Sequence, residues 1–343
     1  MAQTTEASKS AKTQQPEVEQ EVLKIIIDDG SKAAKAIYQD ADGKLVKQLT
    51  KNSFVQGFRT SHRGEASNYL IGLEKYSHHE QAPDALNSSV VSEQYTDLSL
   101  LNVHHALHMT GLNPCDVHVF ATLPLSQFYL PTGDRNVENI QRKKANLLRP
   151  LERFSTDSHA AFRIVEVTVF PESLPAAGPE LESDDVELFE ISLITDLGGT
   201  TLDIASVTGP LEEISKVKGY DDIGCSIVYD EIRRKLESLK LPESDSYIEH
   251  FINMRNEPEK YKVADKYRQE INECVKNAVQ KLCDLVVKQC KGVIEHPHRV
   301  FLIGGGAYLV KDALEQAYPT AAFKVIDDPQ FALANSLAKS IFG

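Results

Sequence analysis

The stretch DLGGTTLDI, residues 196–204, decides the fold of this chain. Apolar runs at 191–194 and 202–207 flank its centre, so the pattern predicts two strands joined by a turn. The turn holds two glycines and two threonines, and the carboxylate of Asp196 ends the first strand. Glycines let backbone N–H groups approach phosphate oxygens, and a carboxylate placed here can hold a hydrated Mg²⁺. An ordinary Gly-Gly hairpin turn is the alternative interpretation.

The first part of the chain repeats this layout. Asp28 ends an apolar run at 22–27, and Gly30 precedes a second predicted strand. Asp196 lies 168 positions after Asp28, about half of the chain, and the same offset places Gly30 on Gly198. A repeat at half-length indicates a duplicated fold, because solenoid repeats have periods of about 20–50 residues. Two acid-tipped turns could therefore face each other across one phosphate chain.

Composition sets the limits on what the chain can do. A length of 343 residues predicts two domains, and a hydrophobic content of 41% is typical of a globular protein. The net charge of −13 argues against a large direct nucleic-acid surface. Five cysteines without a CxxC pair indicate reduced, structural thiols. Without a signal peptide or an apolar run of about 18 residues, the sequence predicts a cytoplasmic protein.

Hydrophobic periodicity predicts an element order similar to βββαβαβα in each half, after a polar tail at 1–21 that we expect to be disordered. In the first half, the expected strands are 22–27, 34–39, 44–49, 68–73, 116–122 and 162–170, and the expected helices are 92–111, 136–149 and 174–181. In the second half, the expected strands are 191–196, 202–207, 213–218, 299–303 and 322–326, and the expected helices are 224–239, 263–293, 308–317 and 330–341. Residues 241–258 are predicted to be irregular, and Ser92 is the candidate N-cap of helix 92–111.

Several charged residues have two interpretations. Glu172 follows a predicted strand 24 residues before Asp196, so it could orient water for attack on a phosphate. It could also merely complement the dipole of the helix that follows. The basic helix 136–149 is either a solvated face or a protein-contact face. His78 is predicted in a solvated loop, and His104 in a packing position without a metal.

A glycine loop follows the strand at 299–303. Gly304-Gly305-Gly306-Ala307 leads directly into a predicted helix. A strand–glycine–helix unit allows the close approach of a flat ring or a phosphate at a helix N-terminus. The chain thus carries three glycine-rich turns, each at the end of an apolar strand.

Together these motifs resemble the actin / heat-shock chaperone ATPase / sugar kinase superfamily. Asp28-Asp29-Gly30-Ser31 looks like its first phosphate motif, residues 196–203 like its second, and residues 304–307 like its adenosine motif. Within it, the chain is similar to the ParM (StbA) family of plasmid-segregating, actin-like ATPases. That similarity covers about residues 22–343, with 240–260 poorly matched, and rests on IDDGS (27–31), VHHAL (103–107), TLPL (122–125), ENIQRKKAN (138–146), PES (171–173), DLGGTTLDI (196–204) and IGGGA (303–307).

The resemblance implies an α/β fold of the duplicated actin-like (ribonuclease H-like) kind. Two domains, each with a mixed five-stranded sheet flanked by helices, would enclose a nucleotide cleft. The first would comprise residues 22–188 and 327–343, and the second residues 189–326.

The resemblance also implies the site. Asp28 and Asp196 would hold Mg²⁺ through water, with Glu172 and Asp196 as the catalytic residues. ATP, or alternatively GTP, would be bound by a set of residues from the three turns. That set is Asp28, Gly30, Ser31, Lys35, Gly198, Gly199, Thr200, Thr201, Gly304, Gly305, Gly306 and Ala307.

The family's activity is filament formation. Its members assemble with ATP into double-stranded filaments in the bacterial cytoplasm, and a ParR-type adaptor bound to a centromere-like site couples them to plasmid DNA. DNA contact would be indirect and no membrane would take part. Another bacterial actin-like cytoskeletal ATPase, or a metabolic kinase of the same fold, is the alternative; the sequence shows no acceptor-sugar motif.

Overall fold

A computed structural model describes residues 22–30, 32–60, 67–79, 85–86, 94–130, 132–154, 160–183 and 185–343. The predicted disordered tail at 1–21, the candidate N-cap Ser92 and the candidate phosphate ligand Ser31 lie outside the described residues.

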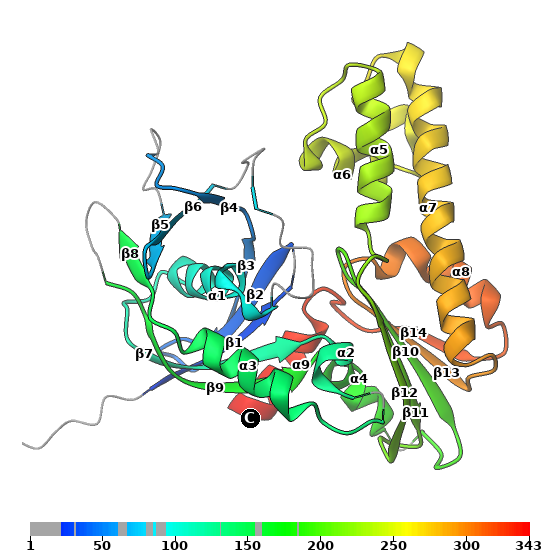
Figure 1. Ribbon diagram of the computed structural model, residues 1–343. Helices are drawn as coiled ribbons and strands as arrows, with labels where there is room; N and C mark the ends of the chain where they lie inside the picture. The colour runs from blue at the N-terminus through cyan, green and yellow to red at the C-terminus, as the bar shows by residue number, and fades with distance from the viewer. Residues whose placement is uncertain are drawn as a thin grey trace, which may run out of the picture.

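Two five-stranded sheets share one topology (Figure 1). The first has the order β3-β2-β1-β7-β9 and the second the order β12-β11-β10-β13-β14. In each sheet the first three strands in sequence are antiparallel neighbours, and the last two are parallel to the central strand. The first sheet comprises β1 (Leu23–Asp29), β2 (Ala33–Gln39), β3 (Leu45–Lys51), β7 (Asp116–Leu123) and β9 (Arg163–Pro171). The second comprises β10 (Ile191–Leu197), β11 (Leu202–Thr208), β12 (Glu213–Tyr220), β13 (Arg299–Ile303) and β14 (Ala322–Val325).

The strand register confirms the duplication at the level of single residues. Asp28 on β1 pairs with Lys35 on β2, and Asp196 on β10 pairs with Asp203 on β11. Asp203 lies 168 positions after Lys35, so the offset that relates the two aspartates also relates their cross-strand partners.

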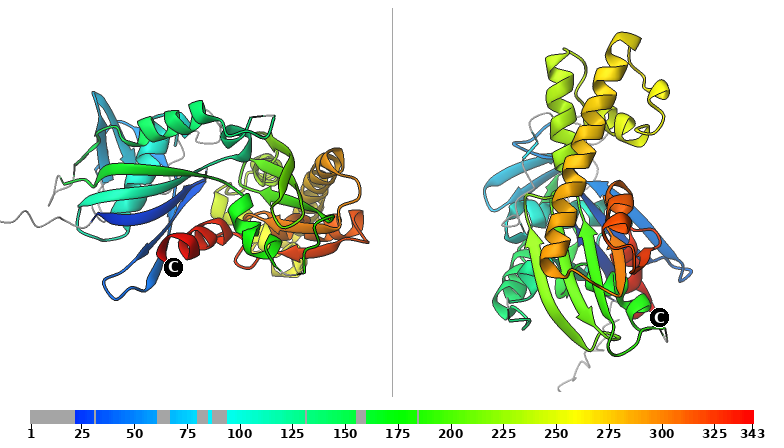
Figure 2. Two further views of the ribbon diagram at one scale, coloured as in Figure 1. Left: turned by 90° about the horizontal axis from the view of Figure 1, so that it is seen from below. Right: turned by 90° about the vertical axis from the view of Figure 1, so that its right-hand side faces the viewer.

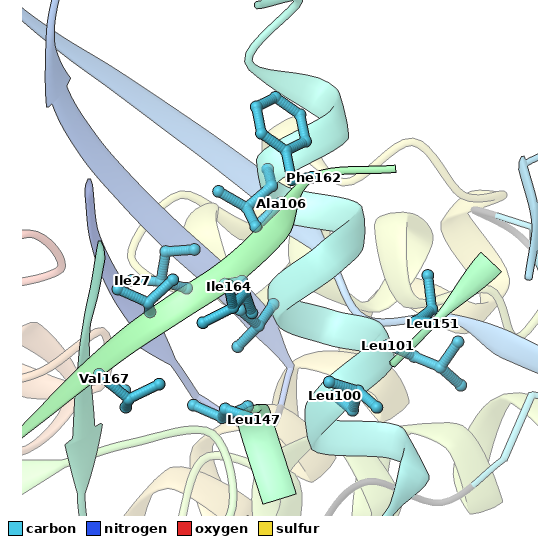
Figure 3. Close-up of a cluster of buried hydrophobic side chains, with 14 of the residues drawn as sticks. Ile27, Leu100, Leu101, Ala106, Leu147, Leu151, Phe162, Ile164 and Val167 are labelled. Carbon is cyan, nitrogen blue, oxygen red and sulfur yellow. The ribbon is translucent and has the colours of Figure 1, made fainter. Parts of the chain in front are cut away.

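Helices cover one face of each sheet. In the first half these are α1 (Asp97–Met109) and α3 (Val137–Leu147). Successive side chains of a strand point to opposite faces, and Ile25 and Ile27 accordingly join the core under α1 whereas Ile26 joins another. Figure 3 shows side chains from α1, β1 and β9 pointing toward one another in this core. In the second half, one face of the sheet is covered by α5 (Ser226–Ser238), α7 (Asp265–Val293) and α8 (Ala307–Ala317).

A third apolar core joins the two halves. It contains α4 (Leu174–Leu181) and α9 (Ala332–Phe342), which pack against each other. Ile26 and Ile37 enter this core from the first sheet, and Ile194 and Ala205 enter it from the second. The C-terminal helix α9, red in Figure 2, lies beside β1 and β2 although about 300 residues separate them in sequence. Because apolar side chains of both sheets are buried in this core, the core holds the two sheets together.

Each half also carries an extension of its own. The first has a small sheet of order β4-β6-β5-β8, formed by β4 (Phe54–Gln56), β6 (Glu74–His78), β5 (Ser67–Ile71) and β8 (Glu152–Phe154). In the second, α5, one end of α7 and α6 (Asp245–Asn253) extend beyond the sheet (Figure 1). The prediction that 241–258 is irregular was therefore wrong, because α6 buries Ile248, Phe251 and Ile252 on one side.

Three further predictions need correction. Helix α1 begins at Asp97, five residues later than expected, because the hydroxyl of Thr96 accepts a hydrogen bond from Leu98 N at 3.3 Å and caps it. His78 belongs to β6 instead of a solvated loop, and its ring stacks on His105 with centroids 3.7 Å apart.

The third correction concerns the basic helix. Lys143 on α3 is fully buried, and its ammonium donates to Asp29 Oδ2 at 2.5 Å and to Ser99 Oγ at 3.0 Å. The helix is therefore not uniformly a solvated face. All five cysteines are free thiols, as predicted. None of the described helices is long and apolar enough to cross a membrane.

Candidate nucleotide-binding site

Four carboxylates meet where the two halves face each other. Asp28 and Asp196 end the central strands, Glu172 follows β9, and Asp203 begins β11. Lys35 on β2 donates to Asp28 Oδ2 at 2.8 Å. The carboxylates of Asp28, Asp196 and Glu172 each raise the pKa of the Lys35 ammonium, as neighbouring anions do.

Hydroxyl groups link these carboxylates. Thr122, at the end of β7, places its hydroxyl 3.3 Å from Asp28 Oδ1 and 3.5 Å from Glu172 Oε1. Ser173 donates to Asp196 Oδ2 at 3.0 Å, across the two halves. Sequence analysis assigned no role to these two residues. Their positions at strand ends, beside predicted site residues, are the signal that would have found them.

The cluster carries more negative charge than it can neutralise. Burial, followed by repulsion from Asp28 and Asp203, raises the pKa of Glu172 well above its ordinary value. Burial also raises the pKa of Asp196 to about 6, although Ser173 and Lys35 lower it, and that of Asp203 to about 8. Burial lowers the pKa of the Lys35 ammonium, but the neighbouring carboxylates raise it by more. Binding of a cation among these carboxylates is therefore electrostatically favourable.

A hydrated Mg²⁺ fits the residues present. Asp203 Oδ1 is buried and accepts no hydrogen bond from the part of the chain that the structure describes. Among these residues, no three His, Cys, Asp or Glu side chains are arranged to bind a metal directly. Mg²⁺ retains several water molecules when it binds to proteins, usually through one or two carboxylates. Asp28 and Asp196 are the residues that would hold such an ion through water.

Backbone strain marks the segment that carries Glu172. Ser173 has φ 65° and ψ −58°, in the region that non-glycine residues seldom adopt, and it is fully buried. Strained residues persist where the surroundings hold them, commonly at functional sites. Here the bond from Ser173 to Asp196 is one of the contacts that hold the turn.

The turn at 198–201 is attached to the start of α5. Gly198 N donates to Thr201 O at 2.9 Å and closes the turn. Cys225 N and Ser226 N donate to the carbonyls of Gly198 and Gly199, at 3.1 and 2.7 Å. A Cβ on Gly224 would lie 2.5 Å from Thr200 Cα, so only glycine allows this contact. Backbone hydrogen bonds and close packing thus hold the turn at 198–201 against the start of α5.

The loop at 304–307 packs against the end of β10. Gly304 has φ +88°, and a Cβ there would lie 2.4 Å from both Asp196 Oδ1 and Leu197 O. Gly306 N donates to Leu197 O at 2.9 Å. A Cβ on Gly305, in contrast, would meet no atom within 4 Å, so no neighbouring group crowds this side of the loop.

The structure thus brings the three predicted turns together, apart from Ser31, which lies outside the described residues. Gly30 faces Lys35, whose Nζ would lie 3.4 Å from a Cβ at position 30. Asp203 is the main residue that sequence analysis missed, and the 168-residue offset from Lys35 pointed to it. A cavity of about 460 Å³ at Ile191, Lys216 and Val293 contains none of the predicted site residues.

Family models match almost the whole chain. The model of the N-terminal part of the plasmid segregation protein ParM matches residues 23–183, and that of its C-terminal part matches residues 186–340. The chain belongs to the ParM family of plasmid segregation proteins. No curated protein sequence matches it.

Solved structures share the ParM fold. A 15-stranded ParM filament from Clostridium botulinum is 17% identical, with a TM-score of 0.69 over 94% of this chain and 99% of that one. A non-polymerisable quadruple mutant of pCBH ParM is 18% identical, with a TM-score of 0.68 over 93% and 99%. The archaeal actin homologue Ta0583 in complex with ADP is 16% identical, with a TM-score of 0.65 over 93% and 99%. The duplicated actin-like fold predicted from the sequence is therefore confirmed.

Proposed function

We propose that this ParM-family protein is an ATPase that binds Mg²⁺–ATP between its halves, assembles into double-stranded dynamic filaments and segregates low-copy plasmid DNA through a ParR-type adaptor. The observation that carries this proposal is the meeting of two acid-tipped hairpins from a duplicated fold at one cluster of carboxylates. GTP is the alternative nucleotide. Residues 22–188 with 327–343 would form one domain and 189–326 the other, because α9 packs on β1 and β2.

The three turns would divide the nucleotide among them. Backbone N–H groups at Gly30 and Gly199 would bind phosphate oxygens, with the Lys35 ammonium beside them. The Gly198 N–H instead closes the turn through Thr201 O. The uncrowded side of Gly305 would lie against adenosine. Bound Mg²⁺ would neutralise phosphate charge, and Asp28 and Asp196 would orient its water shell.

Glu172 would position the attacking water. A carboxylate with a raised pKa is a stronger base, which suits a group that accepts a proton from water. Water oxygen bonds to the γ-phosphorus as the bond to the β–γ bridging oxygen breaks, ADP leaves, and the water proton passes to Glu172. Thr122, within 3.5 Å of Glu172 Oε1, would orient that oxygen.

The same chemistry would control assembly. The γ-phosphate would contact both halves, so its presence favours one interdomain angle and its loss allows that angle to change. Filament contacts would select the closed form; a ParM filament is among the structural neighbours. The net charge of −13 agrees with DNA contact through an adaptor.

The test is pelleting and phosphate release with Mg²⁺–ATP for the wild type and Glu172→Gln. We expect the wild type to assemble and then disassemble as phosphate appears. Glu172→Gln keeps the shape of the side chain but not the base, so it should assemble, persist, and release phosphate about 10²–10⁴-fold more slowly. A wild type that stays monomeric with Mg²⁺–ATP or Mg²⁺–GTP at every concentration would contradict the filament assignment.

A further inference from the structure

Lys32 is fixed to the first half of the molecule by its backbone. It lies in the connection between β1 and β2, and its carbonyl accepts a hydrogen bond from Asn52 N at 3.0 Å. The Asn52 side-chain amide donates to Gly30 O at 2.6 Å, on the other side of the same turn. Both bonds hold the first phosphate turn, and Lys32 with it, against the end of β3.

The Lys32 side chain crosses to the second half. A Cβ at Gly199 would lie 3.0 Å from Lys32 Cγ and 3.1 Å from its Cδ, so the aliphatic stem passes directly over this glycine. The ammonium lies 4.0 Å from the centre of the Tyr229 ring on α5. One side chain of the first phosphate turn therefore spans the second phosphate turn and ends on a helix of the opposite half.

The contact that holds the Lys32 ammonium is weak compared with what a phosphate offers. Lys32 is exposed and makes no ion pair with any residue that the structure describes. A cation over a partly exposed aromatic ring is held less strongly than an ammonium bonded to an anionic oxygen. Lys35, by contrast, is already paired with Asp28 at 2.8 Å. Lys32 is thus the cation beside these turns that a phosphate could recruit.

We propose that Lys32 binds the terminal phosphates of the nucleotide and that Tyr229 holds its ammonium when no nucleotide is present. This rests on the proposed function, because it assigns the triphosphate to the turn at Gly199. The stem stays on Gly199 while the ammonium exchanges the Tyr229 ring for a phosphate oxygen. Tyr229 then competes with the ligand, and binding of the triphosphate breaks one contact between the halves as it makes another.

The test measures dissociation constants for Mg²⁺–ATP and Mg²⁺–ADP by displacement of a fluorescent nucleotide, below the concentration at which light scattering detects assembly. Lys32→Met keeps the stem and removes the charge, so we expect ATP to bind about tenfold more weakly, with a smaller loss for ADP. Tyr229→Leu removes the competing ring, so ATP should bind about two- to fivefold more tightly. In the double variant, affinity should equal that of Lys32→Met.

If Lys32 and Tyr229 made only a structural contact between the halves, both Lys32→Met and Tyr229→Leu would weaken ATP binding. Opposite changes in affinity therefore identify competition between Tyr229 and the nucleotide. Tyr229→Phe, which keeps the ring, and Lys44→Met, at an exposed turn, are the matched controls and should bind as the wild type does. Thermal melting checks that each variant folds. If the wild type binds neither nucleotide, the proposed function fails as well. If the wild type binds and Lys32→Met binds equally well, or Tyr229→Leu binds more weakly, only the assignment of Lys32 is overturned.

Discussion

The two halves of this protein share a sheet topology and a register but differ in chemistry at equivalent positions. Opposite Asp28 the first half has Lys35, whereas opposite Asp196 the second half has Asp203. The residue after Asp28 is Asp29, which is buried against Lys143, whereas the equivalent residue of the second half is the apolar Leu197. The same strand pairing thus places an aspartate opposite a lysine in the first half and opposite a second aspartate in the second half.

This difference shows which residues can differ between the two copies of a duplicated fold. Backbone pairing depends on strand geometry, so side chains at the strand ends can diverge without loss of the fold. The first half supplies its own cation, whereas in the second half burial raises the pKa of Asp196 to about 6 and the partner across the strand is another acid. A magnesium-bearing phosphate chain complements both, because it presents anionic oxygens to Lys35 and a cation to Asp196.

The largest effect is expected from Lys143→Met, which removes the partner of Asp29 in the first half. An uncompensated buried carboxylate, close to Asp28, should lower the free energy of unfolding by about 3–5 kcal/mol. Denaturant titration of the nucleotide-free protein measures it.

Lys144→Met, one position along the same helix, is the control and should stay within about 0.5 kcal/mol of the wild type. Asp29→Leu combined with Lys143→Met gives the first half the chemistry of the second, and should recover most of the loss. Equal stability of the two single variants would show that the buried pair is unimportant.

The second effect is expected from Asp203→Asn, and it depends on pH. Burial holds the pKa of Asp203 at about 8 in the folded protein, above its ordinary value of 3.8, so ionisation opposes folding. This contribution is absent near pH 4 and develops as pH rises to about 8. Asparagine should therefore stabilise the nucleotide-free protein at pH 8 by about 2 kcal/mol or more, since one unit of pKa shift corresponds to about 1.4 kcal/mol.

At pH 4–5 the two proteins should have nearly the same stability, and the difference should grow steadily with pH. Thermal melting across this range tests it. A difference that is constant with pH, or largest in acid, would mean that burial does not raise the pKa of Asp203 in the folded protein.

The smallest effect is expected from Ser173→Ala, which removes the hydroxyl that links the first half to Asp196. Loss of one hydrogen bond to a carboxylate should cost about 1–3 kcal/mol at pH 8, where Asp196 is ionised, and less at pH 5, where it is protonated. Ser126→Ala, at a half-buried position beside Gly219 of the second sheet, is a suitable comparison. A loss that does not change with pH would indicate that Ser173 acts through packing alone.

The duplicated plan could be predicted from the sequence because it depends on local signals. Apolar runs predicted the strands, glycines predicted the three loops, and the carboxylates Asp28 and Asp196 revealed the repeat, whereas the two five-stranded sheets were implied by the family resemblance. The short strands β4 and β8 gave no such signal, since three residues are too few to show a period. Helix α6 did have apolar residues at 248, 251 and 252, but the neighbouring prolines favoured an irregular segment.

The other missed features depend on contacts between distant residues. Lys143 looked like one of several surface cations, and its burial follows from Asp29, 114 residues away in sequence. The bond from Ser173 to Asp196 and the position of Lys32 over Tyr229 likewise join the two halves. A single sequence shows which residues end the strands but not which of them meet across the halves.

The central claim is that one hairpin from each half binds a single Mg²⁺–nucleotide, and titration calorimetry tests it most directly. The wild type, Asp28→Asn and Asp196→Asn would each be titrated with ATP, with and without Mg²⁺. We predict one nucleotide per chain for the wild type, dependent on Mg²⁺, and at least a tenfold loss of affinity in each variant. Two nucleotides per chain, or full affinity in either variant, would contradict the account.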